Sequence, residues 1–306
     1  MRCDYYFTLR CNAYCEFCKI WQDKDLSSVN EVQTMYLQGF FDGLKRIGVK
    51  VISFTGGEPL LREALPDALR LAYSTGFKIN LFTNGILYPA AHEKLKNTVE
   101  TLFVSLDAPA EAEHDRIRGQ ECYKEAVESI MIAVSNKQNT VINFTLTRDS
   151  LQYLPDMVEL AEKLKVKIKI NPVYDYFGLD GFEKESIAYI ARFLKNKRVI
   201  LSRSMLELVN TGGNNIKSPS CAALDRVVTV FPDLSLILPC FRLRQAFIPA
   251  EGDVVKAFGS DIVKGYKKLK GKINECAGCM MWEYLEPQEK RVLGLELPLF
   301  MRRPKT

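Results

Sequence analysis

Strands and helices alternate through the first two-thirds of the chain, and this alternation restricts the fold more than any other feature. Runs rich in apolar and β-branched residues predict strands at 5–9, 51–55, 78–83, 101–106, 141–146 and 166–171. Segments of helical periodicity follow them, among them 35–47, 65–74, 123–135, 154–164 and 186–194. Six such units predict an α/β fold with a parallel sheet and right-handed crossovers.

Three cysteines follow the first expected strand within eight residues. Cys11, Cys15 and Cys18 can all point from one short loop to one place at the strand's carboxyl end. Parallel α/β proteins carry their active sites at this edge. A closed zinc site or a cysteine-bound iron-sulfur cluster usually takes four ligands, so three thiolates leave one metal position open. A zinc knuckle, or one half of a four-cysteine site, would give a similar triplet.

The spacing Cys-x3-Cys-x2-Cys, with Phe17 just before the last cysteine, resembles the signature of the radical S-adenosylmethionine (SAM) enzymes. The resemblance implies that the three cysteines hold a 4Fe-4S cluster whose open iron binds SAM. It also implies a partial (β/α)6 barrel of the TIM type and a one-electron donor such as flavodoxin or ferredoxin. In this family, SAM is cleaved to a 5′-deoxyadenosyl radical that removes a hydrogen atom from the substrate.

A glycine-rich turn, made of Gly56, Gly57, Glu58 and Pro59, follows the second expected strand. Missing side chains in such a turn let a ligand approach the backbone. An ordinary β-turn would also explain the glycines and the proline. Downstream of the cysteine triplet, however, the turn resembles the GGEP element of the same family. That resemblance implies that its backbone and Glu58 receive the amino group of SAM.

Polar residues lie at or near the ends of three further strands. Thr83 ends the third expected strand, Ser105 lies near the end of the fourth, and Asn143 lies within the fifth. The resemblance implies that these residues face SAM, with Ser105 at its ribose or carboxylate. It also implies that Arg116 or Arg118 binds the carboxylate, which a guanidinium can hold with two hydrogen bonds. Ordinary strand polarity is the alternative for Ser105 and Asn143.

Four cysteines in the final third form a second constellation. They are Cys221, Cys240, Cys276 and Cys279. Segments 226–231 and 234–240 predict a β-hairpin that brings Cys221 and Cys240 together at its open end. The other two cysteines are only three residues apart, so the two pairs supply four thiolates. This bare pattern also suits a structural zinc ion.

The same four cysteines are similar to the shortened auxiliary-cluster module called a twitch domain. The longer SPASM module, with seven cysteines, is not matched. The resemblance implies a second 4Fe-4S cluster that is fully ligated by cysteine and accepts an electron from the substrate, which favours oxidation. We therefore expect a radical SAM barrel in residues 1–200. A small C-terminal α+β module, rich in cysteine and containing the β-hairpin, is expected in residues 201–306.

Cys122 precedes the expected helix 123–135 on the same edge of the sheet as the cysteine triplet. It is a candidate hydrogen-atom donor to a substrate radical, which would make the reaction a redox-neutral epimerisation. The alternative is a small residue that packs near a helix start. The role of Cys122 therefore distinguishes the epimerisation hypothesis from the oxidation hypothesis.

Composition limits the remaining classes of function. The 306 residues are 47% hydrophobic and 26% charged with a net charge of +5, which fits one compact enzyme. No apolar run is long enough for a transmembrane segment, and the chain leads directly into a strand, so we expect a cytoplasmic protein. Basic residues are not interleaved with aromatic residues, so nucleic acid is not an expected partner.

A small molecule is the expected substrate class, because no segment resembles a leader-peptide-binding domain. A peptide-modifying enzyme is an alternative, since a separate chain can recognise the peptide. A non-enzymatic iron-sulfur or zinc protein is a more distant alternative. Nine cysteines with short spacings favour metal thiolates over disulfides in each of these cases.

Overall fold

A computed structural model describes residues 1–23, 26, 28–173 and 184–285. Within these residues the strands form one ten-stranded sheet. The strands are β1 (Arg2–Thr8), β2 (Val51–Gly56), β3 (Lys78–Thr83), β4 (Thr101–Ser105), β5 (Thr140–Leu146), β6 (Lys167–Pro172), β7 (Val199–Ile200), β8 (Val227–Val230), β9 (Leu236–Leu238) and β10 (Ala246–Ile248).

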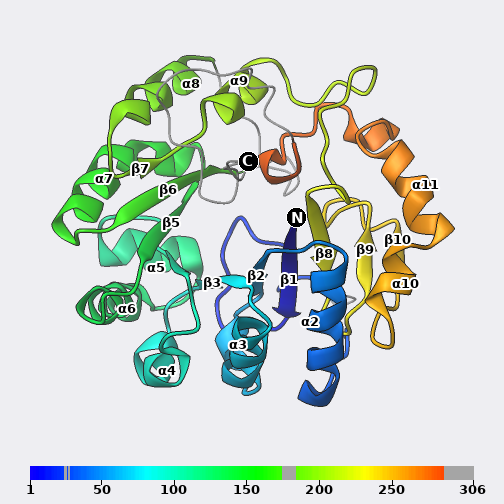
Figure 1. Ribbon diagram of the computed structural model, residues 1–306. Coiled ribbons are helices and arrows are strands. Elements are labelled where there is room, and N and C mark those ends of the chain that lie inside the picture. The colour runs from blue at the N-terminus through cyan, green and yellow to red at the C-terminus, as the bar shows by residue number, and fades with distance from the viewer. Residues whose placement is uncertain (24–25, 27, 174–183, 286–306) are drawn as a thin grey trace, which may run out of the picture.

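The strand order is β10-β9-β8-β1-β2-β3-β4-β5-β6-β7. Strands β1 to β7 pair in parallel, each with the next along the chain. Figure 1 shows the strands curving around a central region, with helices on their outer side. The predicted α/β fold with a partial barrel is therefore confirmed, and its six predicted strands are present with ends shifted by at most three residues.

Helices in the described part of the chain follow most strands. They are α2 (Leu37–Arg46), α3 (Leu65–Ser74), α4 (Tyr88–Leu95), α5 (Glu111–Arg118), α6 (Tyr123–Ser135), α7 (Leu154–Lys163), α8 (Lys184–Ala191), α9 (Arg203–Asn210), α10 (Val254–Phe258) and α11 (Asp261–Leu269). Helices α3 and α6 have the predicted bounds, and α2, α7 and α8 lie within two to three residues of theirs. Helices α4 and α5 were not among the predicted segments, and α5 proves central to the site.

The two faces of the curved sheet differ in polarity, because successive side chains of a strand point to opposite sides. Apolar side chains face the helices and form the main core, among them Tyr5, Phe54, Leu81, Val104 and Phe144. The inner face carries polar residues in register, with Asp4 beside Ser53 and Ser53 beside Asn80. Asn80 donates a hydrogen bond of 3.5 Å to the Ser53 hydroxyl. This inner side of the sheet, which we call the polar chamber, thus presents polar groups to a ligand, beside the stacked rings of Phe82 and Phe103.

The predicted hairpin is confirmed as β8 and β9, which pair antiparallel. Its position is less expected, because β8 also pairs in parallel with β1 and so extends the barrel sheet. Strand β10, which was not predicted, adds a further antiparallel partner to β9. The hairpin therefore shares a sheet with the barrel, and the predicted domain boundary at residue 200, which falls at the end of β7, stays a prediction.

The end of the described chain returns to the barrel interior, where it lies near the amino terminus in Figure 1. The Glu283 carboxylate lies 3.1 Å from the Lys169 ammonium on β6 and 3.7 Å from the Arg2 guanidinium on β1. The Tyr284 and Thr229 hydroxyls share a hydrogen bond of 2.7 Å. These contacts fasten the segment that follows the last cysteines to the inside of the barrel. Residues 286–306 of the predicted C-terminal module lie outside the described residues.

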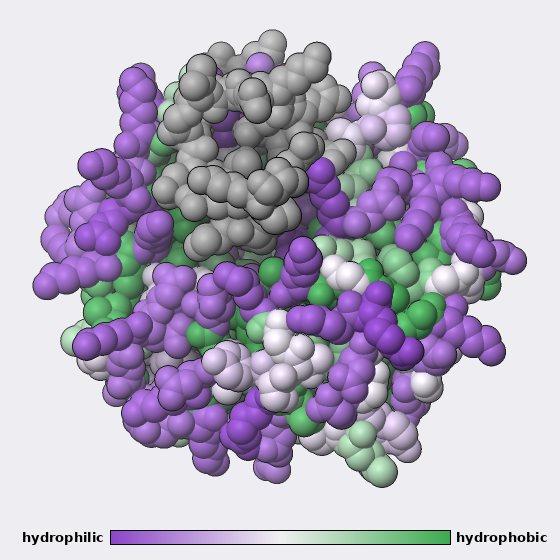
Figure 2. Space-filling model, in the orientation of Figure 1, coloured by the Kyte–Doolittle hydropathy of each residue, from purple (hydrophilic) through white to green (hydrophobic). Residues whose placement is uncertain are grey.

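The helices test the expectation that the chain has no transmembrane segment. None of the helices in the described ranges combines the length and the apolar character needed to cross a bilayer. Hydrophilic side chains edge the face that Figure 2 shows.

Candidate functional site

The three cysteines of the first motif lie together in the loop after β1, which we call the cysteine loop (residues 11–18). Cys15 is buried, and Cys11 and Cys18 are half-buried. Burial raises the pKa of the Cys11 thiol to about 12, and the charges of Glu58, Cys15 and Cys18 act in the same direction. Thiolates crowded in a dry site are stabilised when they bind a metal. Their donor chemistry thus fits the predicted cluster.

The end of α5 fixes the shape of this loop. The Tyr14 amide donates to the Arg118 carbonyl at 2.9 Å, and the Glu16 amide donates to the Ile117 carbonyl at 3.0 Å. Gly119 ends the helix with a φ of 61°, and a Cβ atom there would lie 2.7 Å from the Tyr14 carbonyl oxygen. A side chain at this position is excluded by both conformation and space. The loop is therefore held by backbone contacts that do not require a metal.

The glycine turn lies against the end of β1. The Gly57 amide donates to the Thr8 carbonyl at 2.9 Å, and the Glu58 amide donates to the Arg10 carbonyl at 2.8 Å. A Cβ atom on Gly57 would lie 2.0 Å from the Arg10 oxygen. The glycine is therefore required by the chain's own backbone, which is a different reason from the predicted approach of a ligand. The predicted contacts of Gly56 and Gly57 with SAM stay predictions.

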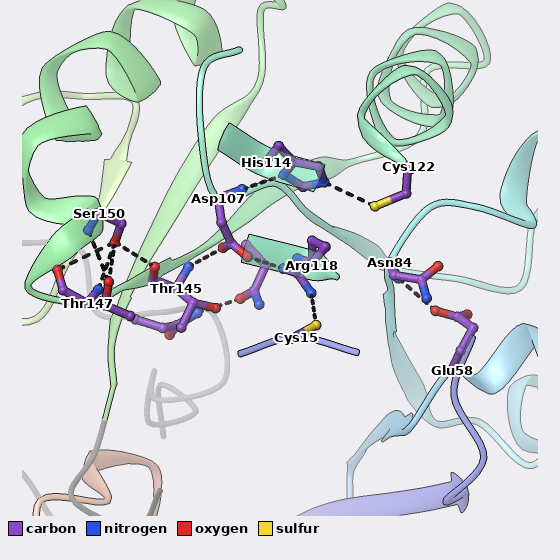
Figure 3. A network of polar contacts seen from close by, with 12 residues as sticks. Cys15, Glu58, Asn84, Asp107, His114, Arg118, Cys122, Thr145, Thr147 and Ser150 are labelled. Carbon is purple, nitrogen blue, oxygen red and sulfur yellow. Dashed lines mark hydrogen bonds and ion pairs between the residues drawn. The ribbon is translucent and has the colours of Figure 1, made fainter. Parts of the chain in front are cut away.

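Glu58 is fully buried and joins three parts of the site (Figure 3). Its carboxylate accepts hydrogen bonds from the Thr83 hydroxyl at 2.9 Å, the Asn84 amide at 2.7 Å and the Leu60 amide at 3.1 Å. The Asn84 side chain in turn donates to the Asn12 side chain of the cysteine loop at 2.7 Å. Burial raises the pKa of Glu58 to about 7 despite these donors. Glu58 and Thr83 thus brace one another, and their predicted contacts with SAM stay predictions.

The two candidate arginines of α5 point to different environments. Arg118 is buried, and its guanidinium lies 2.5 Å from the Asp107 carboxylate and 3.5 Å from the Cys15 sulfur. Arg116 is 54% exposed and pairs with Glu16 at 2.9 Å. The Nε atom of Arg118 is buried without a hydrogen-bond partner among the described residues. Both arginines thus contact the cysteine loop, Arg116 through Glu16 and Arg118 through Cys15, and the predicted contact of one of them with the SAM carboxylate stays a prediction.

Asp107 and His114, which sequence reasoning did not assign to the site, form a network with Arg118 (Figure 3). The Asp107 carboxylate accepts a hydrogen bond of 2.7 Å from the Thr145 amide. The Asp107 amide donates to His114 Nδ1 at 3.1 Å. Burial lowers the pKa of His114 to about 3, so the ring is neutral and carries its proton on Nε2. The sequence signals of this network were the position of Asp107 directly after the fourth expected strand and that of His114 in the segment of the two arginines.

Cys122 lies at the far end of this network. Its sulfur is 3.4 Å from His114 Nε2, and the residue is 1% exposed. Burial raises the pKa of its thiol to about 12. Cys122, His114 and Asp115 bring three potential metal ligands within 4.8 Å of one another. Because His114 Nδ1 accepts from the Asp107 amide, the neutral ring directs its Nε2 proton at the sulfur, and the arrangement suits a buried, hydrogen-bonded thiol.

The remaining predicted SAM contacts lie on the inner face near the carboxyl ends of the strands. Ser105 and Asn143 are neighbours in the register of β4 and β5. The Asn143 side chain accepts a hydrogen bond of 2.5 Å from Asn171, whose own amide oxygen is buried without a partner among the described residues. Phe17 lies with its ring 5.6 Å from the Arg118 guanidinium. Unpaired polar atoms in this chamber fit a polar ligand such as SAM.

The four cysteines of the final third, which we call the auxiliary site, line one cavity. Cys221 and Cys240 come from either side of the β8-β9 hairpin, and Cys276 and Cys279 come from a later turn. Burial raises the pKa of the Cys240 thiol to about 12 and that of Cys221 to about 11, and neighbouring thiolates add to both effects. The structure therefore brings together all four cysteines that the sequence singled out.

Comparisons with known proteins agree with this geometry. A family model described as Radical SAM superfamily matches residues 5–161. An AdoMet-dependent heme synthase of Oleidesulfovibrio alaskensis is 29% identical over 160 residues, which are 51% of this chain and 41% of that protein. A probable GTP 3′,8-cyclase of Metallosphaera sedula is 26% identical over 238 residues, covering 71% of this chain and 74% of that one. The chain thus spans less than half the length of the heme synthase.

Solved structures share the fold. SuiB of Streptococcus suis, in a crystal structure bound to its precursor peptide SuiA, superposes with a TM-score of 0.74 at 16% identity. The match covers 93% of this chain and 70% of SuiB. The structure of anSMEcpe with bound AdoMet gives a TM-score of 0.66 at 16% identity, covering 88% of this chain and 82% of that one. At these identities the likeness concerns the fold alone.

Proposed function

Because the chain belongs to the radical SAM superfamily, we propose that it removes a hydrogen atom from a small molecule and oxidises it, with the auxiliary site as electron acceptor. The observation that carries the proposal is the gathering of seven cysteines into two places. Three lie in the loop beside the carboxyl ends of the strands, and four line a separate cavity. One site has an open ligand position and the other has none, so they suit different tasks.

In this proposal the cysteine loop holds the first 4Fe-4S cluster, and the polar chamber holds SAM. Cys11, Cys15 and Cys18 are the metal ligands, and Arg118 offers its free Nε to the SAM carboxylate. Ser105 and Asn143 lie side by side on the inner face, where they can bind the rest of the molecule. The bound groups supply a one-electron reductive cleavage that generates the hydrogen-abstracting radical. A flavodoxin or ferredoxin is the proposed electron donor.

The auxiliary site favours oxidation over a redox-neutral reaction. A second 4Fe-4S cluster on Cys221, Cys240, Cys276 and Cys279 would supply an electron acceptor close to the barrel. The contacts of Glu283 and Tyr284 with the inner face support this role, because they bind the segment after Cys279 to the chamber. Zinc at these four thiolates is the alternative that the donor set also permits.

Epimerisation with Cys122 as hydrogen donor is the less favoured alternative. Its thiol is buried and lies 3.4 Å from His114 Nε2, an arrangement that packing alone also explains. A peptide substrate is a second alternative, since the fold matches SuiB over 93% of this chain. Relatives named as heme synthases and GTP cyclases favour a small molecule instead.

Metal analysis and SAM cleavage test the proposal together. The anaerobically reconstituted protein should contain about eight irons per chain, four for each cluster. A variant with Cys11, Cys15 and Cys18 all replaced by Ala should keep about four irons and form no 5′-deoxyadenosine. About four irons plus one zinc in the wild-type protein would contradict the proposed auxiliary cluster. Cleavage of SAM by the triple variant would contradict the assignment of the first site.

A further inference from the structure

Asn214 lies in the middle of the auxiliary site, although nothing in the sequence around it indicates a role. It follows α9 and lines the same cavity as the four cysteines. Only 4% of the residue is exposed. A buried amide must satisfy its donors and its acceptor within the protein. Its partners therefore show what the residue does.

The side chain of Asn214 joins three separate segments. Its Nδ2 group donates to the Gly271 carbonyl at 2.8 Å and to the Cys276 carbonyl at 3.0 Å. Its Oδ1 atom accepts a hydrogen bond of 3.3 Å from the amide of Ser220, the residue before Cys221. Both amide donors and the acceptor are thus used. One side chain links the segments that carry the first and third cysteines of the auxiliary site.

The backbone of Asn214 binds the fourth cysteine. Its amide donates to the Cys279 carbonyl at 2.8 Å, and its carbonyl accepts from the Gly278 amide at 3.0 Å. Gly213 permits this pairing, because a Cβ atom there would lie 2.2 Å from the Gly278 oxygen. Three of the four cysteine segments are therefore attached to one residue.

We infer that Asn214 is the positioning residue of the auxiliary site, which links the segments of Cys221, Cys276 and Cys279 so that their thiols can bind one metal centre. The inference rests on the proposed auxiliary cluster for its function, but the arrangement itself concerns only the chain. Partners that orient ligands from outside the coordination sphere typically change metal affinity by about 10- to 100-fold. Asn214 acts through such contacts and does not touch the reacting atoms.

The geometry distinguishes hydrogen bonding from simple space filling. Asn214→Asp keeps the size of the side chain and the acceptor for Ser220, but it removes the amide donor to Gly271 and Cys276. A carboxylate would instead face two carbonyl oxygens. If Asn214 only filled space, the Asp variant would behave like the parent.

The test uses the full chain with Cys11, Cys15 and Cys18 replaced by Ala, so that metal binding reports on the auxiliary site. Titration of the reduced apoprotein with Co²⁺ is followed by the thiolate-to-cobalt charge-transfer band. Asn214→Ala and Asn214→Asp should both bind Co²⁺ about 10- to 100-fold more weakly than this parent. The neighbouring Asn215, which is exposed, provides the control, and Asn215→Ala should bind as the parent does.

Unchanged Co²⁺ affinity in Asn214→Asp would overturn the inference, because this variant keeps the shape of the residue. Circular dichroism checks that each variant retains the barrel. Reconstitution with iron and sulfide is measured separately on the same proteins. A parent protein that takes up no iron would contradict the proposed auxiliary cluster. The Co²⁺ titration would still test the role of Asn214.

Discussion

The cysteine loop and the auxiliary site both gather buried thiols, but the chain builds them in different ways. The cysteine loop is local, with three cysteines in eight residues held against the end of α5. The auxiliary site takes its cysteines from positions 221 to 279. Its central residue, Asn214, forms hydrogen bonds to residues 57 and 62 positions away. The cysteine loop is a local sequence motif, whereas the auxiliary site is assembled by contacts between segments that are distant in the sequence.

This difference determines what each metal should contribute to the protein. Backbone hydrogen bonds to the end of α5 hold the cysteine loop, so we expect a metal there to add chemistry and little structure. The auxiliary region has only short strands and helices around four thiols, and small units of this kind depend on metal binding for part of their folding free energy. Removing a ligand from the cysteine loop should therefore reduce mainly activity. Removing a ligand from the auxiliary site should reduce mainly stability.

The largest expected effect comes from replacing one cysteine by Ala, in each site separately. Cys15→Ala should abolish formation of 5′-deoxyadenosine with little change in the melting temperature of the reconstituted protein. Cys279→Ala should retain SAM cleavage but melt at a clearly lower temperature and form less product. Chromatography of 5′-deoxyadenosine and a thermal melt of each variant provide the measurements. A Cys279→Ala protein with the wild-type melting temperature would contradict the claim that the auxiliary site stabilises its region through metal binding.

The next effect concerns the ion pair that fastens the auxiliary region to the barrel. Lys169→Met leaves the Glu283 carboxylate with the more distant Arg2 as its cation, at 3.7 Å. Because Glu283 is half-buried and keeps Arg2, the loss in the free energy of unfolding should stay below the roughly 3 kcal/mol that removing one partner of a fully buried pair costs. Denaturant unfolding measures this value. Lys163→Met, which breaks an exposed pair with Glu159 on α7, is the control and should cost far less. Equal effects in the two variants would show that Glu283 does not fasten the region.

Glu58 provides a pH-dependent test on the cysteine loop side. Burial raises the pKa of this carboxyl from an ordinary value of 4.5 to about 7. The folded state therefore binds the proton more tightly than the unfolded state does. The resulting stabilisation is fully present below pH 4.5 and is lost as the pH rises through about 7. The difference amounts to about 3 kcal/mol.

Between about pH 4.5 and 7, unfolding of the reduced apoprotein should thus show the wild type losing stability relative to Glu58→Gln. The lowered pKa of His114 acts in the opposite direction over much of this range, but it is common to both proteins and cancels in the difference. The exposed Glu63 serves as the control, and Glu63→Gln should keep the wild-type slope. An identical pH dependence in wild type and Glu58→Gln would mean that the carboxyl does not titrate in this range.

The sequence was sufficient for features that depend on nearby residues. Runs of apolar and β-branched residues and segments of helical periodicity located six of the parallel strands and several helices, because each pattern reflects the burial of a single element. The spacing of Cys11, Cys15 and Cys18 indicated a common site, because one loop carries all three. The hairpin of β8 and β9 followed from its turn and its apolar runs. Its pairing with β1 did not, since no local signal specifies a partner more than 200 residues away.

Long-range polar contacts set the limit of sequence reasoning. Helix α5 has few apolar residues, and its importance comes from the end that supports the cysteine loop. Glu58 was assigned to a ligand, yet its hydrogen bonds lead to Thr83 and Asn84, 25 and 26 residues away. Asn214 resembles any loop asparagine until its partners are known. Polar side chains gain their roles from tertiary structure, and the sequence records only that they are polar.

The smallest effect separates the two arginines that the sequence left equivalent. Arg116 is 54% exposed in its pair with Glu16, and such pairs contribute at most about 1 kcal/mol. Arg116→Gln should therefore leave both the free energy of unfolding and SAM binding nearly unchanged. Isothermal titration of SAM into the reconstituted protein measures the affinity. Arg118→Gln, two residues further along α5, is the matched substitution. Arg118→Gln should weaken SAM binding and also destabilise the fold, because Asp107 is fully buried beside it. A loss of SAM affinity in Arg116→Gln alone would move the proposed carboxylate contact from the chamber to the surface of the cysteine loop.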